Sequence, residues 1–231
     1  MFTLDQVVPW GRSFEEYQRI FALSDADLAR PIVGCGDGPA AFNAEATRLG
    51  ARVVSCDPLY QFTLGEIDGR LGVTCDTVLE QTRRNAGQFV WGHGIASIAE
   101  LGTVRMRAMR TFLDDYDAGR AAGRYVDASL PTLPFADASF DLALCSHLLF
   151  LYSAQLDEAF HVAAVREMCR LAPDVRIFPL LALDGARSPF VDACLAEARG
   201  AGMDATIERV DYEFQRGGNE MLRLRRGAVP A

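Results

Sequence analysis

The sequence of 231 residues predicts an α/β protein with a doubly wound, mostly parallel seven-stranded sheet. Three observations support this class. Short apolar runs alternate with amphipathic segments, glycines follow the first apolar run, and the end of the chain has the period-two pattern of a strand hairpin. With 50% hydrophobic residues, one sizeable core can form, so we expect a single domain over 1–231.

The first 30 residues predict a helical cap. Ser13 is a candidate N-cap, because Glu16 follows three residues later and apolar residues then recur at helical spacing. Ser24 and Asp25 predict a second, shorter turn of helix. We therefore expect residues 1–30 to form an N-terminal helical cap within the domain.

The segment from Pro31 to Asp57 predicts a Rossmann-like βαβ unit. An apolar run leads to three alternating glycines, an amphipathic segment stops at Gly50, and a second apolar run ends at Asp57. Glycines without Cβ atoms permit a tight turn and a close approach of the backbone to a ligand. An acid about 20 residues further on can accept hydrogen bonds from both hydroxyls of a ribose.

A helical insertion is expected after the second strand, over residues 60–122. Its composition is that of helices with breaks at Gly72 and in 91–94, and its length greatly exceeds an ordinary crossover. We expect it to contribute to substrate specificity through aromatic and titratable groups, which are Tyr60, Phe89, Trp91 and His93. Arg105 and Arg110 are spaced so that they can clamp an anion or pair with nearby acids.

The rest of the chain predicts the remaining sheet and its crossovers. Pro179 within one apolar run indicates a strand end or a local irregularity. We expect strands over 123–127, 140–146 and 174–183, helices over 154–171 and 189–202, and a C-terminal antiparallel hairpin of 204–212 and 219–225.

The order of the glycines distinguishes two classes of cofactor. A dinucleotide fingerprint starting at Gly34 needs a third glycine at position 39, which is Pro39. The pattern of Gly34, Gly36 and Gly38 instead resembles motif I of the class I S-adenosylmethionine-dependent methyltransferases. The segment 124–147, which contains LPFADASFDLALCSH, resembles the small-molecule members of that superfamily.

This resemblance implies the cofactor site. Asp127 and the backbone of Ala128 are expected at the adenine, because an acid accepts the amino proton and an N–H meets a ring nitrogen. The resemblance covers about residues 31–183 without the insertion. The expected cofactor-binding residues are Gly34, Cys35, Gly36, Gly38, Asp57, Pro58, Asp127, Ala128 and Ser146.

Two further residues complete the expected site. His147 follows the fourth strand and is the candidate catalytic residue, either as a proton acceptor or as a group that only orients its loop. Ile32 stands where the superfamily carries an acid that organises the methionine end of the cofactor. Another group must then meet the methionine charges, and Arg12 is our candidate for the carboxylate, with Tyr17 as a second contact.

Composition excludes several classes. The net charge of −8 disfavours nucleic-acid partners, and no apolar run is long enough to cross a membrane. The six cysteines show no metal-ligand spacing, so we expect buried thiols and no metal. The chain has no lysine, which excludes Schiff-base chemistry on a lysine. Its first residues lack a signal-peptide pattern, which predicts a cytoplasmic protein.

The leading hypothesis is methyl transfer from S-adenosylmethionine to a small-molecule acceptor, with S-adenosylhomocysteine as product. The first alternative is a protein of the same fold that binds these ligands without turnover, which Ile32 and the insertion favour. The second is a nicotinamide-dependent oxidoreductase, which Asp57 permits and Pro39 disfavours. Binding and transfer assays distinguish the three.

Overall fold

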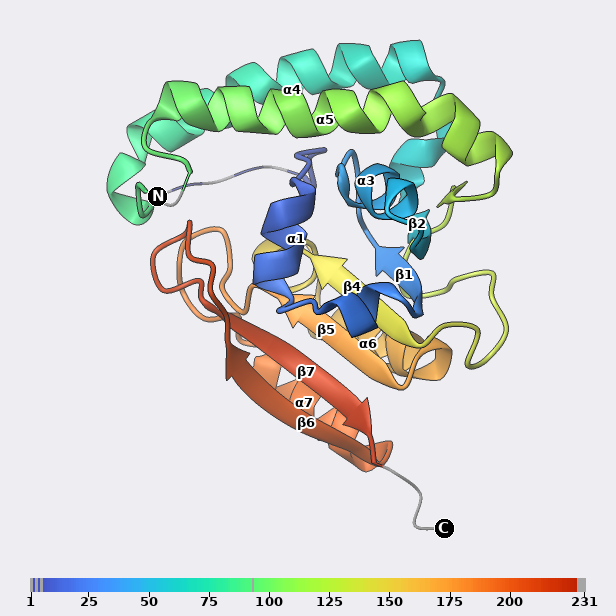
Figure 1. Ribbon diagram of the computed structural model, residues 1–231. Helices are drawn as coiled ribbons and strands as arrows, with labels where there is room; N and C mark the ends of the chain where they lie inside the picture. Colours follow the sequence, from blue (N-terminus) through green and yellow to red (C-terminus); the bar gives the residue numbers. More distant parts are fainter. Residues whose placement is uncertain (1, 3, 5, 93, 228–231) are drawn as a thin grey trace.

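The computed structural model describes residues 2, 4, 6–92 and 94–227, and Figure 1 shows its layers. Its centre is a seven-stranded sheet in the order β3-β2-β1-β4-β5-β7-β6. The predicted fold class is confirmed, including the antiparallel C-terminal hairpin. The strands are β1 (Pro31–Cys35), β2 (Arg52–Cys56), β3 (Tyr125–Val126), β4 (Leu142–Ser146), β5 (Asp174–Phe178), β6 (Met203–Arg209) and β7 (Glu220–Arg226).

Helices cover both faces of this sheet. On one face α3 packs on β2 and against α1 and α5, and on the other α6 and α7 pack on β4, β5 and β6. The helices are α1 (Phe14–Ile20), α2 (Asp25–Leu28), α3 (Phe42–Arg48), α4 (Leu64–Arg84), α5 (Ile98–Ala121), α6 (Glu158–Leu171) and α7 (Val191–Gly200). Short 3-10 turns are η1 (Pro58–Gln61), η2 (Ala86–Gln88) and η3 (Phe150–Tyr152).

The first five strands run parallel, so their carboxyl ends meet at one edge of the sheet. β1 pairs with β2 on one side and with β4 on the other, and β4 pairs with β5. All five residues of β4 and of β5 are buried, which explains their nearly continuous apolar sequence. The loops that leave β1, β2, β4 and β5 therefore converge, as ligand-binding loops do in open α/β sheets.

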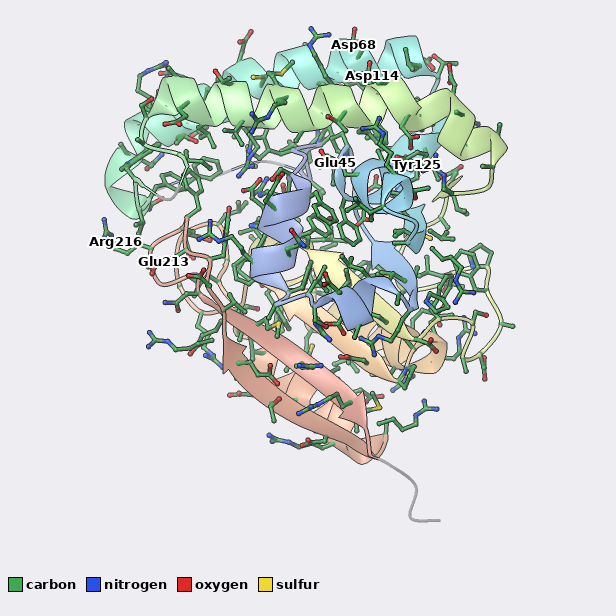
Figure 2. All side chains as sticks on the ribbon, viewed as in Figure 1. Glu45, Asp68, Asp114, Tyr125, Glu213 and Arg216 are labelled. Atoms are coloured by element: carbon green, nitrogen blue, oxygen red, sulfur yellow. The ribbon has the colours of Figure 1, made fainter. Side chains whose placement is uncertain are left out.

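The insertion forms the long helices α4 and α5, which pack against each other. In Figure 1 the pair lies beyond the ends to which β1, β4 and β5 point, and Figure 2 shows exposed Asp68 and Asp114 on it. Thr63 and Glu66 form a capping box that begins α4. The expected break at Gly72 is wrong, because this exposed glycine costs only about 1 kcal/mol relative to alanine and the apolar face of α4 is buried on both sides of it.

An aromatic cluster joins the insertion to the sheet. The hydroxyl of Tyr116 on α5 donates to the backbone oxygens of Tyr60 and Phe62, both at 2.9 Å. Tyr60 and Tyr125 are buried with it in one apolar cluster, which also includes Ile67 and Leu71 of α4. The insertion is thus part of the hydrophobic core of this edge.

A buried ion pair ties α1 to α5. Arg105 is fully buried and forms a bidentate pair with Glu16, which also closes the capping box of α1 with Ser13. The hydroxyl of Tyr212, from the loop between β6 and β7, donates to Glu16 at 2.8 Å. Burial raises the pKa of Glu16, but Arg105 reverses this effect and lowers it to about 2. Glu16 is therefore ionised throughout the physiological range.

The loop between β6 and β7 reaches the insertion. Figure 2 places Glu213 and Arg216 on this loop, close to the end of α4. The backbone N–H of Arg216 donates to the oxygen of Gln88 at 2.8 Å, and Val90 donates to Phe214 at the same distance. Segments more than 120 residues apart in the chain therefore lie side by side.

Two predicted boundaries need correction. The strand expected over 174–183 ends at Phe178, because Pro179 has no N–H for the ladder. The helix expected over 154–171 begins only at Glu158, where Asp157 accepts the N–H of Phe160 as N-cap. Among the described residues, no helix is both long and apolar enough to span a membrane.

Candidate functional site

A cavity of about 970 Å³ lies at the carboxyl edge of the parallel strands. Its walls come from the N-terminal segment (residues 6–12), the glycine loop (residues 34–38), the loops after β2, β4 and β5, and helix α4. The predicted site residues that line it are Arg12, Gly36, Gly38, Asp57, Pro58, Ser146 and His147. One cavity thus brings together residues that are up to 135 positions apart.

The glycine loop has the backbone geometry that its sequence indicates. Gly36 and Gly38 have φ of +71° and +52°, in the left-handed region that favours glycine. A Cβ on Gly36 would lie 2.3 Å from Cδ2 of Leu148. The N–H of Gly36 donates to Cys56 at 2.8 Å, and Tyr60 donates its hydroxyl to the oxygen of Gly38 at 2.7 Å. Hydrogen bonds to Cys56 of β2 and to Tyr60 of η1 therefore hold the glycine loop in place.

Asp37, inside the glycine loop, is a site residue that the sequence analysis missed. Its two carboxylate oxygens accept the hydroxyls of Tyr17 at 2.8 Å and Ser55 at 2.5 Å. A Cβ on Gly34 would lie 1.8 Å from Oδ2 of Asp37, so glycine at 34 makes room for this carboxylate. Burial raises the pKa of Asp37 to about 6, although both hydroxyls oppose the shift. Its position within the glycine run was the only available signal.

Asp57 holds the glycine loop from the end of β2. One oxygen accepts the N–H of Gly38 at 2.9 Å and the other accepts that of Leu59 at 2.8 Å. Burial raises the pKa of Asp57 to about 6 against these two hydrogen bonds, and Asp127 adds to the rise. Each carboxylate oxygen keeps a further lone pair for a ligand on the cavity side.

Arg12 is a buried cation at the wall of the cavity. Its Nη1 donates to the oxygen of Trp10 at 2.9 Å, and its Nε has no hydrogen-bond partner among the described residues. No carboxylate of the described chain lies within ion-pair distance of it, and its exposed fraction is 9%. Burial lowers the pKa of Arg12, and the neighbouring Arg105 lowers it further. Such a charge is costly unless an anion reaches it.

The sequence around Arg12 fixes its place beside the glycine loop. The N–H of Ala41 donates to the oxygen of Arg12 at 3.0 Å. A Cβ on Gly11 would lie 2.1 Å from the oxygen of Pro39, so only glycine permits this close packing of two backbones. Tyr17, the other predicted contact, lines the same wall and donates to Asp37.

His147 occupies a left-handed backbone conformation, with φ of +53°. Its N–H donates to the oxygen of Phe178 at 2.6 Å, which links the ends of β4 and β5. Its Nδ1 lies 2.8 Å from the hydroxyl of Ser146. Burial lowers the pKa of His147 well below its ordinary value, with contributions from Arg12 and Arg105, so the imidazole is neutral at pH 7. A non-glycine residue held in this conformation is typical of functional sites.

Other predicted site residues lie behind or beside the cavity. Gly34 and Cys35 are buried beneath the loop, and burial raises the pKa of the Cys35 thiol. Asp127 is exposed and Ala128 half-buried, and neither lines the cavity, whose wall here is formed by Ser129 and Leu130. The turn after β3 thus reaches the cavity two residues later than the resemblance implied.

Some residues of the insertion line the cavity, and others do not. Phe89 lines the cavity, and Trp91 packs on Phe89 and Phe214 behind it. Arg105 pairs with Glu16, and exposed Arg110 is not a lining residue, so the hypothesis of an arginine clamp is wrong for both. His93 lies outside the described residues.

All six cysteines are buried and unpaired. Within 2, 4, 6–92 and 94–227, no three or more His, Cys, Asp and Glu side chains are grouped to hold a metal ion. The polar side chains that line the described cavity include arginine, carboxylate, hydroxyl and imidazole groups.

The sheet order, the glycine loop and the cavity at the carboxyl edge define a Rossmann-like α/β protein with a cavity at its topological switch point, where open α/β sheets bind ligands. No protein-family model matches the chain. The Uncharacterized protein MJ0045 of Methanocaldococcus jannaschii is 34% identical over 224 residues, which cover 96% of this chain and 98% of that protein. The chain belongs to the same family as MJ0045.

Three solved structures, two of them named as methyltransferases, are similar to the chain at low identity. The mitomycin 7-O-methyltransferase MmcR is 14% identical, with 93% of this chain and 54% of that chain covered and a TM-score of 0.48. TnmH is 12% identical, with 92% of this chain and 54% of that chain covered and a TM-score of 0.49. A third structure is magnesium protoporphyrin IX methyltransferase (ChlM) from Synechocystis PCC 6803 with bound SAH. It is 12% identical, with 88% of this chain and 77% of that chain covered and a TM-score of 0.48. The chain spans about half the length of TnmH and MmcR.

Proposed function

We propose that this protein binds S-adenosylmethionine in the cavity and transfers its methyl group to a small-molecule acceptor. The observation that carries the proposal is buried Arg12, which has no carboxylate of the described chain within ion-pair distance and lies at the same cavity as the glycine loop and Asp57. A carboxylate from a ligand would satisfy Arg12, and a ribose would satisfy Asp57. A ligand with both groups is an amino-acid nucleoside.

The chain offers a partner for each part of such a ligand. Arg12 would meet the α-carboxylate with charge-assisted hydrogen bonds, and the backbone of Gly36 and Gly38 permits close approach. Asp57 would accept the ribose hydroxyls. Three apolar residues that line the cavity beyond it, exposed Pro58 and buried Leu59 and Leu130, would contact the base. Asp127 stays a proposed contact only for the outer edge of that base.

When bound, S-adenosylmethionine supplies a methyl group on a sulfonium, which is already an activated leaving group. The protein then has to bind, align and desolvate the acceptor, which can account for much of the rate. Neutral His147 lies at the cavity wall and can take a proton from that acceptor. No metal is needed for any of these roles.

The proposal is tested by calorimetry with S-adenosylhomocysteine, S-adenosylmethionine and NAD, followed by a transfer assay with tritiated methyl groups. We expect binding of the first two and none of NAD. Binding without transfer to any acceptor would favour the silent alternative, for which buried Ile32 at the usual position of the acid is the supporting observation. Preferred binding of NAD would reject the proposal.

Protonation of Asp57 should weaken ligand binding. The pKa of Asp57 is about 6 in the folded protein, so the carboxylate is ionised above pH 6 and neutral below it. Since only the ionised form accepts from both ribose hydroxyls, the affinity for S-adenosylhomocysteine should fall about tenfold between pH 7.5 and pH 5. Calorimetry over this range measures it.

The matched variant is Asp57→Asn, which cannot titrate. It should bind less tightly than the wild type at pH 7.5 and show a much flatter dependence on pH. If the affinity depends equally on pH in the two proteins, another group causes the dependence. Asp37 is then the candidate, because its pKa is raised to about 6 as well.

A further inference from the structure

The cavity has two chemically different ends. Its charged lining residues come from the turn just before α1, the glycine loop, the end of β2 and the first turns of α4, and they are Arg12, Asp37, Asp57, Glu66 and Arg70. The far end is lined by the N-terminal segment and by the loops after β4, β5 and β6. Its side chains include Val8, Leu151, Phe160, Leu183 and Phe214.

The two charged residues of α4 are already engaged. Glu66 accepts hydrogen bonds from the N–H and the hydroxyl of Thr63, and Arg70 lies over the ring of Phe62 at 3.9 Å. Because the charged lining residues all lie at the other end, the described lining of the far end offers no charge to a ligand. A charged group placed there would lose its hydration without a partner, which is costly.

The cavity is large enough for two ligands. Sites for one small molecule span about 300 to 1,000 Å³, and this cavity of about 970 Å³ is about three times the lower bound of that range, so two small ligands fit in it. A nucleoside at the charged end leaves the apolar end for a second, ring-sized molecule. The apolar lining then determines what that molecule is.

His147 lies where the two ends meet. Its Nδ1 is paired with Ser146, whereas its Nε2 has no hydrogen bond to the described residues and is not sealed from solvent. Because burial keeps its pKa well below the ordinary value, this imidazole is a weak base. A weak base takes a proton more readily from a more acidic hydroxyl, so a phenol or enol suits this imidazole better than an aliphatic alcohol does.

We propose that the far end binds an uncharged, apolar, ring-sized acceptor that presents a phenolic or enolic hydroxyl to Nε2 of His147. This inference rests on the proposed function. In the transfer, the acceptor oxygen bonds to the methyl carbon and the carbon–sulfur bond breaks, with its electron pair passing to sulfur. The hydroxyl proton passes to Nε2, so the histidine leaves the step as imidazolium.

The binding test uses protein saturated with S-adenosylhomocysteine and two probes that differ in one charge. Calorimetry compares 2-naphthol with 6-hydroxynaphthalene-2-sulfonate, and we expect 2-naphthol to bind at least tenfold more tightly. Leu183→Asp, at the far end, should weaken 2-naphthol binding at least tenfold. Leu183→Asn has the same shape without the charge and should lose less, and both variants should bind S-adenosylhomocysteine like the wild type.

The transfer test supplies tritiated S-adenosylmethionine and 2-naphthol and measures labelled 2-methoxynaphthalene. His147→Gln should reduce the rate about 100-fold while 2-naphthol binding is retained. Protein that does not bind S-adenosylhomocysteine contradicts the proposed function itself. If that ligand binds but the sulfonate matches 2-naphthol, or 2-naphthol does not bind, the apolar assignment is overturned. Binding of 2-naphthol without methylation, or full activity of His147→Gln, overturns the assignment of the hydroxyl and its base.

Discussion

Replacing Arg12 with methionine should weaken the binding of S-adenosylhomocysteine at least about 30-fold, equivalent to about 2 kcal/mol. The guanidinium is buried, its Nε is unpaired, and no carboxylate of the described chain lies within ion-pair distance of it; Glu16 attracts it only from further away. Removing it takes away the only described cation at the glycine-loop end of the cavity other than Arg70, which lies over Phe62. Calorimetry of the variant and the wild type measures the difference.

The same variant should be more stable than the wild type when no ligand is present. Burial lowers the pKa of Arg12, which shows that the folded protein disfavours this charge. Thermal unfolding should therefore give Arg12→Met a higher Tm than the wild type without ligand and a smaller gain in Tm on adding S-adenosylhomocysteine. Arg107→Met, on the exposed side of α5, is the matched control and should change neither quantity. Wild-type affinity in Arg12→Met would remove Arg12 from the site.

Gly34→Ala should lower the free energy of unfolding by about 3 kcal/mol. The new Cβ would overlap Oδ2 of Asp37 at 1.8 Å, so the carboxylate would have to leave its place. The hydroxyls of Tyr17 and Ser55 would then lose their buried acceptor. Urea unfolding measures this loss, and binding of S-adenosylhomocysteine should be lost with it because the glycine loop is displaced.

A double-mutant cycle isolates this cause. Asp37→Ala removes the overlapping atoms along with the two hydrogen bonds, so adding Gly34→Ala to it should cost almost nothing more. Gly72→Ala is the control for a glycine with nothing near its Cβ position, and it should stabilise α4 by about 0.5 to 1 kcal/mol. If the losses in the free energy of unfolding from Gly34→Ala and Asp37→Ala add up in the double variant, Gly34 is not required to make room for Asp37.

The fold was predictable because local signals and burial agree along most of the chain. The continuous apolar run of β4 and the period-two pattern of β7 each allow one type of element. The helical insertion was equally visible, since α4 repeats its buried residues at helical spacing. Gly72 misled the analysis, because packing of an amphipathic face outweighs the low helix propensity of one residue.

The site was predictable where it depends on backbone geometry at strand ends, as at Gly36, Gly38 and Asp57. Asp37 was missed because its importance comes from Tyr17 and Ser55, which approach it only in three dimensions. The pairing of Arg105 with Glu16 was also hidden, since 89 residues separate them. A sequence shows which groups are present, and long-range packing decides which of them are already paired.

The three-way contact of Glu16 with Arg105 and Tyr212 also bears on how ligands enter and leave. Swinging α5 outward would separate a buried ion pair, at a cost of about 3 to 5 kcal/mol. The described residues before Gly11 are held by apolar packing and by uncharged hydrogen bonds, with Val8 bonded to the hydroxyl of Tyr152 at 3.2 Å and Gln155 donating to the oxygen of Leu4 at 2.6 Å. We expect exchange to proceed by peeling back this segment while the helices stay in place, so product release is governed by a short arm of the chain.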